Sequence, residues 1–210
     1  MVAEGTYRQA ELMKGVQNKT FISSNLAGTD WAHLGLDLCG FRFVGGSLKG
    51  ANFQGLSLDG VNFVGVDLTE ANFSFATLKR ARFSQSRLES VSFDHTDLGQ
   101  ATFHQVNLRW GQFKYSRLEA ALLQDVDLFH AAFSYANLHR AFFKRVSLKS
   151  ANLRKATLCK ARFQYVDCWG AHLPDGRQAG SSADLNAFTR CGSCGQTVDI
   201  EFKALPQAQR

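Results

Sequence analysis

A period of five residues constrains this chain more than any other feature. Phe or Leu occupies every fifth position from Phe53 to Leu173, with Cys168 as the one exception. Two residues before most of these positions stands a small or β-branched residue, such as Ala71 or Val61. A helix of 3.6 residues per turn and a strand of period two would both scatter such a set over several faces. We therefore expect the chain to turn every five residues.

Four such sides would make a square coil of 20 residues, with the large and the small apolar residue of each side pointing inward. Residues 20 apart should then stack at about the 4.8 Å spacing of paired strands and resemble one another. They do, since two opposed sides carry mostly phenylalanine and the other two carry leucine. The sequence predicts an all-β fold, a quadrilateral parallel β-helix of about seven coils with a filled, dry interior. The columns are Phe53, Phe73, Phe93, Phe113 and Phe133; Phe63, Phe83, Phe103, Leu123, Phe143 and Phe163; Leu58, Leu78, Leu98, Leu118, Leu138 and Leu158; and Leu68, Leu88, Leu108, Leu128 and Leu148.

The repeated unit reads Ala-(Asn or Asp)-(Leu or Phe)-X-X, for example at residues 71–75, 136–140 and 151–155. It resembles the pentapeptide repeat family over about residues 21–173. The resemblance implies a right-handed quadrilateral β-helix. It implies a binding surface but no single partner, because the family includes quinolone-resistance proteins that bind DNA gyrase, bacterial effectors and other scaffolds.

The two ends depart from the repeat and divide the chain into a cap at residues 1–20, a β-helix at 21–173 and a tail at 174–210. Phe21, Leu26, Trp31 and Leu36 keep the period in another phase, and the main register starts at Leu38. A two-residue insertion near residues 33–36 explains the shift, and we expect a β-bulge, with a functional loop as the alternative.

Both ends of a solenoid expose unpaired backbone and need covers. Residues 7–19 and 182–188 are predicted to form short capping helices, with Ser181 or Ser182 as the N-cap of the second. Pro174-Asp175-Gly176 predicts the turn out of the last coil. Related proteins often dimerise through a C-terminal segment, which implies a homodimer here.

Composition places the protein in a broad class. The formal net charge of +6 favours anionic partners. No apolar run approaches the roughly 20 residues that span a bilayer, and residues 1–17 do not resemble a signal peptide. Five scattered cysteines, an odd number, are not a disulfide framework. We therefore expect a cytoplasmic protein without a transmembrane segment.

Metal and catalytic sites have little support. Cys191-Gly192-Ser193-Cys194 is half a zinc site or a redox pair, and Cys168 and His172 would complete four zinc ligands if the tail folded back. An incidental tail turn is the favoured alternative, so we expect no metal and no cofactor. Flat outer sides offer no concave pocket for catalysis, and the histidines of the repeats, His95, His104, His130 and His139, are expected to be solvated. We predict that the chain is not an enzyme.

The outer surface carries the candidate sites. The outward position two after the core residue forms one column of aromatic residues that ends in a lysine: Phe75, His95, Tyr115, Tyr135 and Lys155. Such a column fits a hot spot for a protein partner, although rings in a β-ladder also stabilise each other. Trp110 and Phe129 add apolar surface on another side. A basic stretch without acids also stands out, with Arg140, Lys144, Arg145, Lys149, Arg154, Lys155, Lys160 and Arg162.

These surfaces lead to three hypotheses. The first is a non-catalytic protein-interaction scaffold that uses the aromatic column and the basic end. The second, implied by the resemblance, is a gyrase- or topoisomerase-binding protein that protects against quinolones, for which only the acidic stretch with Asp59, Asp67 and Glu70 would serve. The third is a binder of nucleic acid or an anionic membrane through the basic coils. A solvated surface with a chance imbalance of charge is the alternative for that stretch.

Overall fold

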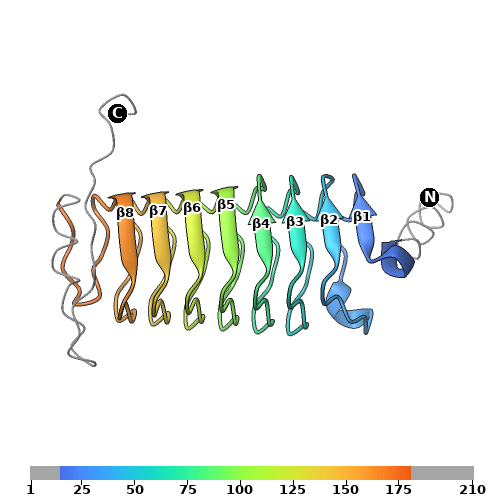
Figure 1. Cartoon of the computed structure of the whole chain (residues 1–210), viewed down its shortest axis with the longest axis horizontal. Coiled ribbons are helices and arrows are strands. Elements are labelled where there is room, and N and C mark those ends of the chain that lie inside the picture. Colours follow the sequence, from blue (N-terminus) through green and yellow to red (C-terminus); the bar gives the residue numbers. More distant parts are fainter. Residues whose placement is uncertain (1–14, 181–210) are drawn as a thin grey trace.

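The structure is a computed structural model that describes residues 15–180, and within them the chain winds as a four-sided parallel β-helix (Figure 1). One side is a continuous parallel sheet whose strands follow the order of the sequence. Its strands are β1 (Thr20–Ile22), β2 (Arg42–Val44), β3 (Asn62–Val64), β4 (Arg82–Ser84), β5 (Thr102–Asn107), β6 (Leu122–Asp127), β7 (Phe142–Ser147) and β8 (Arg162–Asp167). We call this the sheet side and name the others, in chain order, the second, third and fourth side. In one coil these sides are centred on Phe83, Leu88, Phe93 and Leu98.

The 20-residue register predicted from the sequence is confirmed. On the sheet side Phe63 pairs with Phe83 and Phe83 pairs with Phe103. The third and fourth sides are joined by single parallel bridges with the same offset, such as Asn72 with Ser92 and Thr77 with Asp97. The second side is joined in the same way as far as Asn107, after which its pairs belong to strands β5 to β8. In the regular middle coils, each coil therefore pairs with the next on all four sides.

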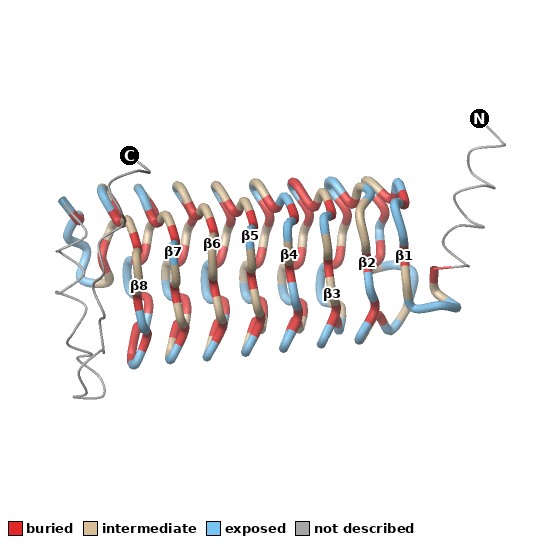
Figure 2. The backbone as a smooth tube through the Cα atoms, turned by 45° about the horizontal axis from the view of Figure 1, so that its top comes forward, coloured by how far each residue is buried: buried red, intermediate tan, exposed pale blue. Residues whose placement is uncertain are grey.

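The interior is filled by the predicted columns, which appear in Figure 2 as buried positions that recur along every coil. Rings within a column stack, and the Phe53 and Phe73 centroids lie 4.7 Å apart with the ring planes 1° apart. The two opposed phenylalanine columns meet edge to face, as Phe63 and Phe73 do at 5.9 Å and 73°. Both are favoured aromatic geometries, so the core combines close packing with two kinds of ring contact.

Sharp corners follow from the backbone conformation two residues after each core residue. That residue has a positive φ throughout the regular coils, for example 71° at Gly60 and 64° at Phe75. Glycine enters this left-handed region without steric cost, which explains the run of corner glycines. Other residue types occupy the remaining corners at a cost.

The first coil contains the predicted insertion in a different form. β1 pairs with β2 at an offset of 22 residues, Phe21 with Phe43, whereas later strands pair at 20. The two extra residues lie between Trp31 and Leu38, where a 3-10 helix η1 (Trp31–His33) precedes a loop. The prediction of a β-bulge is therefore wrong. A bulge needs a paired strand, and no bridge joins the fourth side of this coil to the next within residues 15–180.

The described residues cover only part of each predicted cap. Residues 15–18 are helical, and Val16 packs against the core. At the other end Pro174, Asp175 and Gly176 form the predicted turn, and the chain doubles back so that His172 pairs antiparallel with Gln178. The helix predicted at 182–188 lies outside the described residues. No helix among residues 15–180 is long and apolar enough to cross a membrane.

Candidate functional site

The predicted aromatic column exists as a continuous stack, which we call the aromatic ladder: Phe75, His95, Tyr115 and Tyr135. It runs along the corner between the third and fourth sides. Successive ring centroids lie 4.8, 4.9 and 4.9 Å apart, and successive ring planes differ by 6°, 13° and 13°. The 20-residue register produces this stack directly, because it places four corner residues one coil apart.

The exposure of large rings sets the aromatic ladder apart from an ordinary surface. Phe75, Tyr115 and Tyr135 are large rings that remain 57%, 52% and 45% exposed. All four residues also have a positive φ between 58° and 64°, which is costly for residues with a bulky side chain. Gly55 occupies the same corner in the preceding coil without that cost. Because the other corners of the regular coils share this positive φ, the exposure of the rings is what distinguishes the aromatic ladder.

Lys155 ends the aromatic ladder. Its Nζ donates a hydrogen bond of 2.9 Å to Tyr135 Oη and lies 5.0 Å from the centre of the Tyr135 ring. The hydrogen bond to Tyr135 raises the pKa of Lys155 above its ordinary value. One end of the stack therefore carries a fixed positive charge. At the other end the same corner, one coil before Phe75, is occupied by Gly55.

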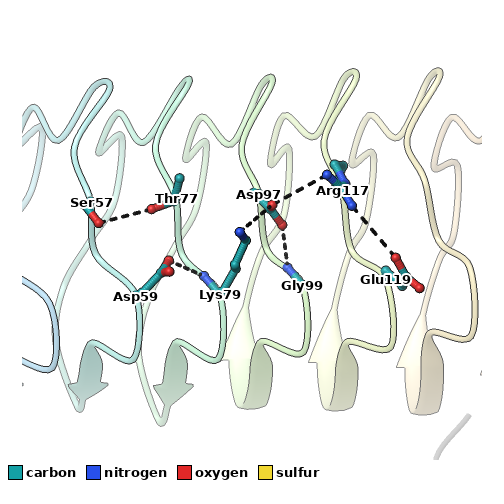
Figure 3. A network of polar contacts seen from close by, with 8 residues as sticks. All are labelled: Ser57, Asp59, Thr77, Lys79, Asp97, Gly99, Arg117 and Glu119. Carbon is teal, nitrogen blue, oxygen red and sulfur yellow. Dashed lines mark hydrogen bonds and ion pairs between the residues drawn. The ribbon is translucent and has the colours of Figure 1, made fainter.

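The fourth side, which follows the aromatic ladder in the chain, is covered by a polar network (Figure 3). Asp97 lies 3.6 Å from Lys79 and 3.8 Å from Arg117, and Arg117 lies 3.9 Å from Glu119. Exposed pairs at these distances contribute little to stability. Charges of both signs alternate along this side, so it forms a polar border of mixed charge beside the aromatic ladder.

The predicted basic residues do not form one surface. Arg140 and Lys160 lie at the corner before the sheet side, Lys144 lies on the sheet side, and Arg154 lies on the third side, where it donates a hydrogen bond to His172. Arg162 lies over the Phe142 ring, 4.7 Å from its centre.

Two of these cations are also neutralised. Arg145 makes two hydrogen bonds to Asp125, the longer 2.7 Å, and Lys149 pairs with Asp167 at 3.1 Å. Both carboxylates belong to neighbouring coils. The structure therefore brings the aromatic ladder together with Lys155 and spreads the other basic residues around the solenoid.

A second aromatic cluster on the second side was recognised in sequence only as Trp110 and Phe129. The Arg109 guanidinium lies 4.9 Å from the Trp110 ring and 4.5 Å from the Phe129 ring, and it pairs with Asp127 at 3.2 Å. His130 meets Phe129 edge to face at 4.2 Å. The offset of 20 residues between Arg109 and Phe129 is the signal that could have revealed this contact.

The proposed zinc ligands are only partly described. Cys168 is fully buried in a core position, whereas His172 lies on the outer surface of the third side, so the wall of the solenoid separates them. Cys191 and Cys194 lie outside the described residues, and the zinc hypothesis stays a prediction. Cys159 is buried. Within residues 15–180 no group of three His, Cys, Asp or Glu side chains could hold a metal ion.

The four histidines of the repeats lie on different parts of the surface. His95 belongs to the aromatic ladder, His104 lies on the sheet side 3.9 Å from Asp125, His130 occupies a corner of the second side, and His139 lies on the fourth side. The coil geometry therefore does not bring them together.

Comparison with known proteins agrees with this geometry. A solved structure of full-length QnrB1, described as a plasmid-mediated fluoroquinolone resistance protein, shares 16% identity with the chain. The match covers 87% of this chain and 93% of QnrB1 with a TM-score of 0.50. A pentapeptide repeat protein from the Arabidopsis thaliana thylakoid lumen shares 25% identity over 50% of this chain and 67% of its own, with a TM-score of 0.31. The likeness to QnrB1 concerns the fold alone.

Matches to protein-family models are more direct, although no curated protein matches the chain. The family model described as a pentapeptide repeat region matches residues 56–133. A second model, described as pentapeptide repeats in eight copies, matches residues 127–164 and 143–175. Both matches fall within the regular coils. The chain belongs to the pentapeptide repeat family.

Proposed function

We propose that the protein is a non-catalytic interaction scaffold that holds a protein partner against the aromatic ladder. The observation that carries this proposal is the continuous row of stacked, half-exposed aromatic rings along one corner of the solenoid. Rigid aromatic residues that bury well are the commonest hot spots of protein interfaces. An adjacent lysine adds a charge that a partner carboxylate can pair with.

The stacking favours a protein partner over nucleic acid. Single-stranded nucleic acids bind aromatic side chains through ring faces, on which the bases stack. Within the aromatic ladder the faces of His95 and Tyr115 are already covered by neighbouring rings at 4.8 to 4.9 Å. Ring edges and tyrosine hydroxyls are what remain, and these suit the mixed apolar and polar side chains of a protein surface.

Site-directed photo-crosslinking tests this proposal in cells that produce the protein. A photoreactive residue at Ser134, next to Tyr135, should crosslink to one discrete partner. The same residue at Gln124, on the opposite side of the coil, should not. Tyr115→Ser together with Tyr135→Ser should abolish the crosslink. The solenoid should stay folded, because Ser90 and Ser150 occupy equivalent corners with φ of 56°.

Trp110→Ser is the matched control, since Trp110 is also an exposed aromatic residue at a corner, with φ of 56°. It should leave the Ser134 crosslink intact. A crosslink that survives the loss of both tyrosines, or that Trp110→Ser removes equally, would show that the aromatic ladder does not bind the partner.

A second candidate function is protection of a topoisomerase from quinolones. It is supported by the likeness of fold to QnrB1 and by the acidic stretch near the N-terminal end. The acidic side chains do not share one side, because Asp59 lies on the fourth side and Asp67 and Glu70 belong to the second. A gyrase supercoiling assay with and without a fluoroquinolone tests it, and unchanged gyrase activity and drug inhibition would eliminate it.

The third candidate, binding of nucleic acid or an anionic membrane through the basic coils, has less support. The basic residues surround the solenoid, and Asp125 and Asp167 neutralise two of them. A gel shift on linear DNA with a salt titration tests this function, because phosphate contacts weaken steeply with salt. A cytoplasmic location and a dimer formed through the C-terminal segment stay predictions from the sequence.

A further inference from the structure

A hollow opens at the corner between the fourth side and the sheet side, next to β2, β3 and β4. This corner is not the one that carries the aromatic ladder. Three arginines and one carboxylate supply the charges of the hollow. It is lined by Gly40, Arg42, Asp59, Gly60, Asn62, Arg80 and Arg82.

The register explains the shape of the hollow. Gly40, Gly60 and Arg80 occupy the same corner in successive coils, and a Cβ at either glycine would meet nothing within 4 Å. On the sheet side Arg42 pairs with Asn62 and Asn62 pairs with Arg82. Gly60 and Asn62 therefore form a low floor. Arg42 lies in the coil before this floor, and Arg80 and Arg82 lie in the coil after it.

Most of the other arginines within residues 15–180 pair with a carboxylate, and the arginines of the hollow do not. Arg109, Arg117 and Arg145 each pair with a carboxylate. Arg42, Arg80 and Arg82 make no ion pair with any other residue in the described range 15–180. Unpaired guanidinium groups gathered in one place repel one another, and a bound anion would remove that repulsion.

Asp59 is the one carboxylate that lines the hollow. Its Oδ1 accepts a hydrogen bond of 2.9 Å from the backbone N–H of Lys79, so part of its charge is already engaged. Three cations against one anion leave the hollow positive.

We propose that this hollow binds a phosphate group. The planar fork of a guanidinium donates two parallel hydrogen bonds to a phosphate, and guanidinium groups on opposite sides can hold one phosphate between them. The two glycines leave room for the phosphate oxygens near the backbone, and the Asn62 amide adds a neutral donor. The phosphate belongs either to a free phosphorylated small molecule or to a nucleic-acid backbone.

Isothermal titration calorimetry with pyrophosphate, at low ionic strength, tests the site. Arg80→Gln and Arg82→Gln should each weaken binding roughly tenfold, as expected for a lost hydrogen bond to a charged group. Glutamine fits the corner of Arg80, since Gln85 and Gln100 adopt φ of 52° and 59° at corners. Arg82 belongs to strand β4, where no positive φ is required. Asp59→Asn should instead strengthen binding, because it removes the opposing charge while an amide oxygen can still accept from Lys79.

Arg140→Gln is the matched control. Arg140 occupies the same corner as Arg80 three coils further on, with the same φ of 58°, and does not line the hollow. It should leave pyrophosphate binding unchanged, and so should loss of Tyr115 and Tyr135. Circular dichroism should confirm that every variant is folded. Absence of pyrophosphate binding, or equal weakening by Arg80→Gln and Arg140→Gln, would overturn the proposal.

Duplex DNA titrated into the same variants distinguishes the two sources of phosphate. In one outcome Arg80→Gln weakens the binding of both DNA and pyrophosphate, and Arg140→Gln weakens neither. The hollow then binds the phosphates of a nucleic-acid backbone. In the other outcome the hollow binds pyrophosphate, and the protein either does not bind DNA or binds DNA with an affinity that all arginine variants weaken equally. The ligand of the hollow is then a free phosphorylated molecule.

Discussion

Lys155 Nζ donates a 2.9 Å hydrogen bond to the hydroxyl of Tyr135, the residue one coil before it at the same corner. The bond raises the pKa of Lys155, and Tyr135→Phe should bring that pKa back toward 10.5. Because folding raises the pKa, the contact stabilises the fold fully below the pKa of an unfolded lysine, about 10.4. The contribution is lost as the pH rises through the folded-state value.

An NMR titration of the lysine ε-carbon signals measures this pKa directly. The Lys155 ε-protons should also keep their upfield ring-current shift in Tyr135→Phe, which preserves the ring, and lose it in Tyr135→Ser. An unchanged Lys155 pKa in Tyr135→Phe would mean that the hydrogen bond does not form in solution.

Adding one ring to the aromatic ladder at Gly55 should offset part of the backbone strain that a side chain causes at this corner. Gly55 has a φ of 71°, and a Cβ there would meet nothing within 4 Å. Gly55→Ala should therefore destabilise by about 1–2 kcal/mol through backbone strain alone. Gly55→Tyr has the same backbone strain but adds a ring that stacks on Phe75. It should therefore be about 0.5–1 kcal/mol more stable than Gly55→Ala. Urea unfolding of the two variants measures the difference, and equal stability would argue against stacking as a stabilising term.

The core columns should tolerate leucine far better than alanine. Phe83 is fully buried and stacks on Phe63 at 5.1 Å and on Phe103 at 4.8 Å. Phe83→Ala should cost about 3–5 kcal/mol because a cavity remains. Phe83→Leu should cost less, about 1.5 kcal/mol, since Leu123 already fills the equivalent place in this column. Denaturant midpoints check the order, and a leucine variant as unstable as the alanine one would contradict the column picture.

Acid should weaken the contact between Asp125 and Arg145. The hydrogen bond from Arg145 holds the pKa of Asp125 below its ordinary value. A lowered folded-state pKa means that this contribution is present above the unfolded value, about 3.9, and is lost as the pH falls through the folded value. Asp125→Asn should therefore lose less thermal stability between pH 7 and pH 2 than the parent chain does.

Glu70→Gln is the control for that comparison, because Glu70 is an exposed corner carboxylate without an ion pair to any described residue. Thermal melting of the three proteins at both pH values gives the comparison. An identical loss in Asp125→Asn and the parent would show that the pair does not contribute.

How far the sequence predicts this structure depends on whether a feature follows the 20-residue register. The Phe and Leu columns and the aromatic ladder follow it directly, because inward and corner positions can be counted along the chain. The place of the insertion was predicted from the phase change between Trp31 and Leu38. Its form was not, since a bulge and a 3-10 turn add the same two residues.

Features that depend on charge pairing across coils were harder to predict. A count along the chain gave a basic stretch from residue 139 to 162 without acids, yet Asp125 and Asp167 reach its cations from neighbouring coils. The hollow was missed for a related reason. Arg42 and Arg82 are 40 residues apart in sequence and line one hollow only because Gly60 and Asn62, in the coil between them, are short.

The near-identical spacing of the aromatic ladder has a consequence for how a partner would be positioned. A molecule that contacts ring edges could slide by one coil, about 4.8 Å, and meet almost the same surface. The stack alone therefore does not fix the position of a partner along the solenoid axis. Its two ends differ, because Gly55 lies one coil before Phe75 and Lys155 lies one coil after Tyr135. These two residues therefore define the register and the orientation of any bound partner.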